Sequence, residues 1–181
     1  PWCGTSDFLK AENPPLKQSD CSFVIRTREK NGITTRLLRA FEKEEIAYSY
    51  HIPFLKMIEE LSWEPKFPRT TVSYSDSGLP VSCKLSAWSP FIPHDVKNSS
   101  LPAAILTFSV KNKSKNPVEV SLLGLLANPF KIVDQCTPGN TVKKSDRHKS
   151  IVFSASGVPD KHPMARGGLC LSVLGPETSY D

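Results

Sequence analysis

Residues 79–88 read LPVSCKLSAW, and this stretch decides the fold class of the chain. Apolar side chains occupy every second position, and polar side chains fill most of the positions between them. The apolar set is Val81, Cys83, Leu85 and Ala87. This period of two predicts a strand that buries one face and leaves the other face in water. Pro90 and Pro93 end the strand, because proline has no N–H to donate to a ladder.

The same alternation continues in residues 103–111 and 117–122, on either side of a polar turn at residues 112–116. Leu106, Phe108 and Val110 share one face of the first of these segments. A proline opens the second segment, which is tolerated because it is the first residue of the strand. We therefore expect residues 79–128 to form a central hairpin around this turn.

Strand signals also occur outside the centre of the chain. Residues 22–28 and 33–39 flank Asn31-Gly32, which is the strongest short signal for a hairpin. Further short strands are expected at residues 46–50, 70–74, 150–154 and 169–174. The stretch after Pro129, including residues 138–140, is expected to be loop. Residues 54–63 have some helical spacing and are interpreted as either a short helix or an irregular covering loop.

The composition agrees with many short strands. The chain has 181 residues, of which 39% are hydrophobic, so a real core can form. Its 16 prolines argue against long helices, because proline is excluded from helix interiors. Short strands with frequent turn signals predict an all-β sandwich or barrel of antiparallel sheets.

The formal net charge of +5 raises the question of an acidic partner. The charges are scattered except for one run at residues 143–149, which contains Asp146 and no aromatic side chain for base stacking. We interpret the run as a solvated loop and expect no nucleic acid partner. No stretch approaches the roughly 18 apolar residues of a membrane span, so no transmembrane segment is expected.

The five cysteines form neither a zinc pattern nor a disulfide framework, since none is in a CxxC pair and their number is odd. Cys83 and Cys170 lie in apolar strand-like runs and are expected to act as small hydrophobic side chains. This pattern of cysteines favours a reducing, cytoplasmic location, although it is also compatible with one or two disulfides. The chain begins at Pro1 rather than Met, so we expect a piece of a longer protein.

Catalytic patterns are missing from the sequence. The four histidines show no metal-ligand spacing, and no cofactor or metal is expected. Two acidic groups are candidates for the carboxylate pair of a glycosidase: Glu42, Glu44 and Glu45, and Glu59, Glu60 and Glu64. Both groups lie among lysines in segments expected at the surface, where nothing would raise the pKa of a general acid.

Aromatic side chains offer a possible surface for stacking on a sugar ring. The candidates are Trp63, Trp88, Phe91, Tyr48 and Tyr50. Trp88 is out of phase with the inward set of its strand, so it stacks on a sugar, packs against another domain, or belongs to the core of a sheet covered on both faces. His94 and Asp95 follow in the proline-rich loop and complete the set of substrate-rim candidates.

Residues 79–93, LPVSCKLSAWSPFIP, resemble a motif of glycoside hydrolase family 116, which includes non-lysosomal glucosylceramidases and bacterial β-glucosidases. The resemblance continues in order through SSLP at residues 99–102, the strand at residues 108–122 and the apolar segment at residues 168–175. It covers about residues 69–175.

The resemblance implies a two-sheet antiparallel β-sandwich, which we expect over residues 21–181 with long loops and little helix. Residues 1–20 have a mixed composition that includes Pro14-Pro15, and they are interpreted as an irregular segment. It also implies a C-terminal (α/α)6 catalytic domain that holds the nucleophile and the acid/base, so no catalytic residue is expected in this chain. The expected role is an accessory domain that braces the catalytic barrel, with a glucoside or glucosylceramide substrate bound through that barrel. The alternatives are a stand-alone carbohydrate-binding module and an immunoglobulin-like adhesion module.

Overall fold

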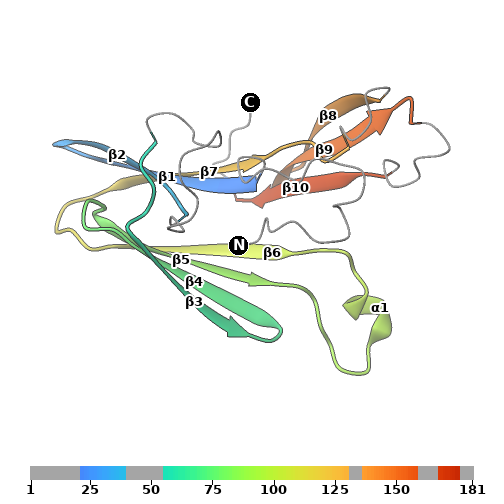
Figure 1. Ribbon diagram of the computed structural model, residues 1–181, viewed down its shortest axis with the longest axis horizontal. Helices are drawn as coiled ribbons and strands as arrows, with labels where there is room; N and C mark the ends of the chain where they lie inside the picture. Colours follow the sequence, from blue (N-terminus) through green and yellow to red (C-terminus); the bar gives the residue numbers. More distant parts are fainter. Residues whose placement is uncertain (1–20, 40–54, 131–135, 159–166, 176–181) are drawn as a thin grey trace, which may run out of the picture. The chain divides into compact units, whose positions relative to one another are not determined.

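The computed structural model describes residues 21–39, 55–130, 136–158 and 167–175, and these are almost entirely strands and loops (Figure 1). The chain divides into two compact units, one of residues Ser22–Gly124 and one of Leu125–Asp181 with Pro1–Cys21. The all-β class is confirmed. The expected irregular segment at residues 1–20 and the strand at residues 46–50 lie outside the described residues, and a single domain over residues 21–181 stays a prediction.

The unit Ser22–Gly124 contains two sheets. Its elements are β1 (Cys21–Glu29), β2 (Gly32–Leu37), β3 (Glu60–Lys66), β4 (Arg69–Ser75), β5 (Val81–Trp88), the short helix α1 (Val96–Ser99), β6 (Ile105–Asn112) and β7 (Glu119–Leu126). One sheet has the strand order β2-β1-β7 and the other has the order β3-β4-β5-β6. The hairpin predicted at Asn31-Gly32 is confirmed, since β1 and β2 pair antiparallel with Glu29 opposite Gly32.

The two sheets of this unit enclose one hydrophobic core (Figure 1). Ile25 of β1 is fully buried and belongs to the same core as Val72 of β4 and Leu85 of β5. Phe23 and Phe108 meet across the core with ring centroids 4.9 Å apart. The inward set predicted for β5 is confirmed, because each of its four side chains is at most 7% exposed. The predicted sandwich is therefore present in this unit.

The hairpin predicted around residues 112–116 is wrong. β6 pairs with β5, whereas β7 lies beside β1 in the other sheet, so the turn carries the chain from one sheet to the other. Asn112 Nδ2 donates to the carbonyl of Asn116 at 2.7 Å, and Lys113 N donates to the carbonyl of Pro80 at 2.8 Å. Alternation could not reveal this, because Phe108 and Val120 pack on the same core from opposite sides.

Two other expectations need correction. The helical alternative for residues 54–63 is wrong over its described part, since Met57 forms a parallel bridge with Leu37 and β3 begins at Glu60. The loop expected after Pro129 is interrupted by a strand that begins at Thr137 and includes Pro138. Proline is tolerated there because this strand lies at the edge of its sheet.

The described part of the second unit is a three-stranded antiparallel sheet. Its strands are β8 (Thr137–Lys144), β9 (His148–Ser156) and β10 (Leu169–Leu174), in the order β10-β9-β8. The strands expected at residues 150–154 and 169–174 are thereby confirmed. Asn128, which precedes β8 in the chain, contacts this sheet. Its Nδ2 donates to the carbonyls of Gly139 and Ser154 at 3.2 and 3.0 Å.

A buried ion pair joins the two sheets of the sandwich. Arg36 of β2 donates through Nε to Asp76 Oδ2 at 2.8 Å, and the Asp76 side chain is fully buried in the turn after β4. Gly78 N donates to the other carboxylate oxygen at 2.8 Å. A Cβ on Gly78 would stand 2.6 Å from Arg36 Nη2, so glycine lets the guanidinium approach this turn.

The described cysteines differ in exposure. Cys83 is 1% exposed, and burial raises the pKa of its thiol to about 11, so its predicted role as a small hydrophobic side chain is confirmed. Cys170 is a free thiol but is exposed, so the same prediction is wrong for it. Within the described segments, no helix has the length and apolarity needed to cross a membrane.

Candidate functional site

The four candidate residues lie at one end of the four-stranded sheet. Trp88 is the last residue of β5, and the other three follow in the loop of residues 89–104. Trp88 pairs with Arg69 of β4 and with Ile105 of β6. Paired residues share a face of the sheet, so Trp88 points away from the core, as its phase predicts. Its side chain is half-buried, so it is neither a core residue nor a freely exposed platform.

The face that carries Trp88 is rich in hydroxyl groups. The register places serines and threonines on it, interspersed with charged residues; the hydroxyl residues are Ser62, Thr71, Ser73, Ser75, Ser82, Ser86, Thr107 and Ser109. The hydroxyl oxygen of Ser86 is buried and has no hydrogen-bond partner in the protein. Hydroxyl groups donate and accept, so this face can form hydrogen bonds with a polar ligand or with another protein.

Phe91 contacts a second aromatic residue, Phe67, which is not among the residues predicted from the sequence. Its ring packs edge-on against Phe67 in the turn between β3 and β4, with centroids 4.9 Å apart and an interplanar angle of 70°. Both rings remain exposed, Phe67 by 78% and Phe91 by 50%. The sequence does contain a signal for Phe67, because it is an aromatic residue in a turn between two polar strands, where a side chain is expected to be exposed. This pair, called the Phe67–Phe91 pair below, is an exposed apolar contact surface.

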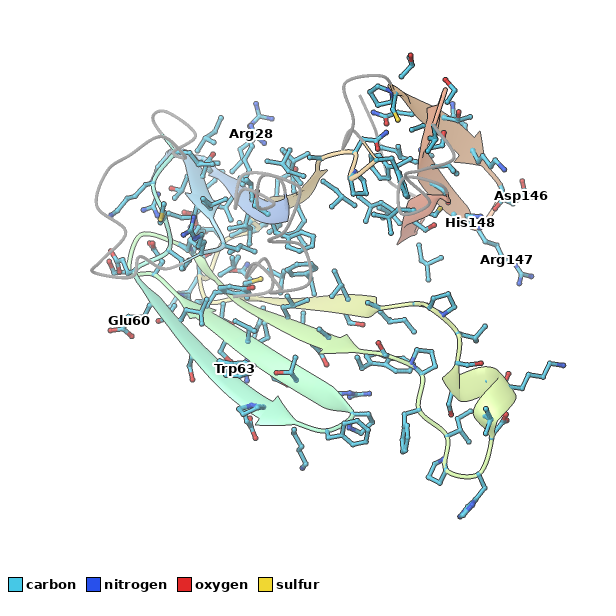
Figure 2. All side chains as sticks on the ribbon, turned by 45° about the vertical axis from the view of Figure 1, so that its right-hand side comes forward. Arg28, Glu60, Trp63, Asp146, Arg147 and His148 are labelled. Carbon is cyan, nitrogen blue, oxygen red and sulfur yellow. The ribbon has the colours of Figure 1, made fainter. Side chains whose placement is uncertain are left out.

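Trp63 lies on β3, the edge strand of the same sheet (Figure 2). It pairs with Val72, so it belongs to the core-facing side of the sheet, yet it is 61% exposed. Its Nε1 donates to Thr70 Oγ1 at 2.6 Å, which fixes the orientation of the indole. Trp63 therefore adds exposed aromatic surface on the opposite face from Trp88. The remaining aromatic candidates, Tyr48 and Tyr50, lie outside the described residues.

Asp95 is occupied by a structural role. Its carboxylate caps α1 by accepting a hydrogen bond from Asn98 N at 3.0 Å, and a second bond comes from the Asn98 side chain. These bonds hold the pKa of Asp95 below its usual value. Ser99 Oγ accepts from Ile92 N and donates to Ile92 O, which closes the loop. His94 is exposed and has a φ of 66°, so it forms part of the same tight loop.

The described carboxylates do not resemble the acid of a glycosidase. Glu59 accepts hydrogen bonds from Ser77 N and Oγ at 2.8 and 3.0 Å, and the backbone bond is the main cause of its lowered pKa. Glu60 and Glu64 are exposed on β3. A general acid needs a raised pKa, whereas the pKa of Glu59 is lowered. The other acidic group, Glu42, Glu44 and Glu45, lies outside the described residues.

The described loops provide apolar contact surface and no metal site. The loop after Trp88 exposes Phe91, Ile92, Val96 and Leu101, the last three by 49, 80 and 53%. This loop projects beyond the ends of the strands (Figure 1). No group of three or more His, Cys, Asp or Glu side chains within the described ranges could hold a metal ion.

Comparison with protein families places this arrangement in a known context. The family model described as "beta-glucosidase 2, glycosyl-hydrolase family 116 N-term" matches residues 10–177. The match includes all of residues 69–175, in which the resemblance was noted, and it extends over both units. Among curated proteins, none matches the chain.

Proposed function

Because this chain belongs to glycosyl hydrolase family 116, as the N-terminal domain of its β-glucosidases, we propose that it is an accessory domain which braces a catalytic (α/α)6 domain. The observation that carries the proposal is the apolar surface of the loop after Trp88 and of the Phe67–Phe91 pair. Aromatic and aliphatic side chains with few charges between them are typical of the centre of a protein interface. The glucoside or glucosylceramide substrate is then bound through the partner domain.

The state of the described carboxylates supports a non-catalytic role. A retaining glycosidase needs two carboxyl groups about 5–5.5 Å apart, one of which has a raised pKa. Glu59, Asp76 and Asp95 each accept hydrogen bonds from neighbouring groups, and the pKa of each is lowered. They are fixed as anions that stabilise turns, which supports the proposal that the bond-breaking groups lie in the partner domain.

The chain alone is expected to show no hydrolysis of an aryl β-glucoside. The physical reason is that hydrogen bonds lower the pKa of Glu59, Asp76 and Asp95, so none of them is suited to act as the general acid. The measurement is release of the aryl group by the purified chain, compared with a catalytic domain of the same family joined to it. Turnover by the chain alone, proportional to its concentration, would disprove the accessory role. Loss of that turnover in Glu59→Gln or Asp95→Asn would then place the active site at the substituted residue.

A carbohydrate-binding module is the second candidate, and the exposed Phe67–Phe91 pair favours it together with Trp63. A sugar ring that stacks on these side chains would change the environment of Trp63. Under this alternative, titration with glucosides at millimolar concentration shifts the tryptophan fluorescence, and Phe67→Ala with Phe91→Ala abolishes the shift. Under the accessory role there is no shift. Phe23→Leu is a matched control, because Phe23 is an aromatic residue that packs on the core.

A further inference from the structure

In the described part of the second unit, the charged residues lie close together in the sequence. Among the described residues from Leu125 to Gly175, every charged side chain lies in the seven residues 143–149. These are Lys143, Lys144, Asp146, Arg147 and Lys149. Four cations and one anion give a formal net charge of +3. The described remainder of the sheet has no ionised side chain, so this end is strongly basic relative to the strands behind it.

The basic residues are held on an ordered turn. Ser145 N donates to the carbonyl of His148 at 2.9 Å, and Ser145 Oγ lies 2.8 Å from His148 Nδ1. Lys144 pairs with Lys149, so the antiparallel ladder continues to the turn. Figure 2 shows Asp146, Arg147 and His148 at the tip of the hairpin between β8 and β9. Lys143 and Arg147 are therefore exposed at an ordered end of the sheet.

Exposed aliphatic side chains lie at the same end. His148 pairs with Leu174 and Lys149 pairs with Val173, so the end of β10 lies beside the basic turn. Leu174 is 80% exposed and Val173 is 48% exposed. On β8, Val142 is 41% exposed. The basic turn and these aliphatic groups are called the tip surface below.

We propose that the tip surface binds membranes that carry anionic lipids. Lysine and arginine near such a membrane are attracted by its negative surface potential, and the aliphatic side chains gain by leaving water for the acyl boundary. Each cation strengthens binding by about fivefold. The described tip surface contains no Phe, Tyr or Trp ring on which a base could stack, so a membrane fits it better than a nucleic acid. The proposal is independent of the accessory role.

Co-sedimentation of the whole chain with lipid vesicles tests the proposal. The chain should bind vesicles of phosphatidylcholine with phosphatidylserine, and not vesicles of phosphatidylcholine alone. Lys143→Gln with Arg147→Gln should weaken binding by about 25-fold. Lys144 and Lys149 are left unchanged, because both make further interactions within the protein. Leu174→Ser should weaken binding to the same vesicles by roughly tenfold, because the leucine side chain no longer leaves water.

The matched control is Lys113→Gln with Lys115→Gln, which removes the same charge from the exposed turn between β6 and β7. This variant should bind as the unchanged chain does. Equal losses in the two double variants would mean that net charge alone causes binding, and equal binding to both vesicle types would remove the lipid selectivity. Either result overturns the proposal. Binding to mixed-sequence duplex DNA without vesicle binding also overturns it and identifies the tip surface as a nucleic acid site.

Discussion

Replacing Asp76 with alanine is expected to lower the free energy of unfolding by about 3–5 kcal/mol. The change leaves Arg36, whose side chain is only 13% exposed, without the carboxylate that now lies 2.8 Å from its Nε. It also leaves the N–H of Gly78 without its acceptor. Urea unfolding followed by the fluorescence of Trp63 and Trp88 measures the loss, since both indoles lie in this unit.

Asp146→Ala is the matched control, because Asp146 is an exposed aspartate in the other unit. It should leave the unfolding of the sandwich unchanged. The double variant Arg36→Met with Asp76→Leu should be more stable than Asp76→Ala, because no unpaired charge remains in the interior. If Asp76→Ala unfolds at the same urea concentration as Asp146→Ala, the ion pair does not hold the sheets together.

The same pair predicts a pH dependence. Burial by itself raises the pKa of Asp76, but the hydrogen bond from Arg36, the N–H of Gly78 and the Arg36 charge outweigh it and lower the pKa overall. A lowered pKa in the folded state means that the stabilisation is complete above the pKa of the unfolded chain, about 4. It is lost as the pH falls through the folded value. The stability difference between the unchanged chain and Asp76→Asn should therefore shrink below about pH 4.

Ile25→Ala is expected to cost about 2–5 kcal/mol of unfolding free energy. Ile25 is fully buried between the sheets, so the shorter side chain leaves a cavity that the packed neighbours fill only in part. The same fluorescence-monitored urea unfolding measures the cost.

Ile33→Ala is the matched control, since it removes the same atoms from a side chain of β2 that is 54% exposed. Its effect should be a small fraction of the effect of Ile25→Ala. Similar losses in the two variants would contradict the position of Ile25 at the centre of the core.

Local patterns predicted the strands and one side of the core. Alternation at residues 81–87 identified the buried face of β5, and Asn31-Gly32 identified the hairpin of β1 and β2. The partner of each strand was harder to predict, because period two is the same for a strand that pairs with its neighbour and for one that crosses to the opposite sheet. β6 and β7 show this difference. β8 was not predicted because it contains Pro138, which is tolerated only in an edge strand. The position of β8 at the edge of its sheet depends on tertiary pairing that the sequence pattern does not reveal.

For the candidate site after β5, the sequence predicted some of the residues but not their contacts. The phase of Trp88 gave its face, but its partial burial depends on residues from β4 and β6 that pair with its strand. Asp95 was selected for its chemistry, whereas it caps a four-residue helix that is too short to produce a periodic signal. Phe67 escaped selection because its contact with Phe91 joins two loops that are separate in the sequence.

The place of β7 beside β1 has a consequence for how the sandwich is made. The two strands come from opposite ends of the unit, so their ladder closes only after β2 to β6 have been synthesised. Closing so long a loop costs entropy before any contact offsets it, which is typical of β-sandwiches that fold in milliseconds to seconds. Until β7 (Glu119–Leu126) has been synthesised and has paired, one edge of β1 has unpaired N–H and C=O groups that can template aggregation. A fragment that stops before β7 would keep that edge open permanently.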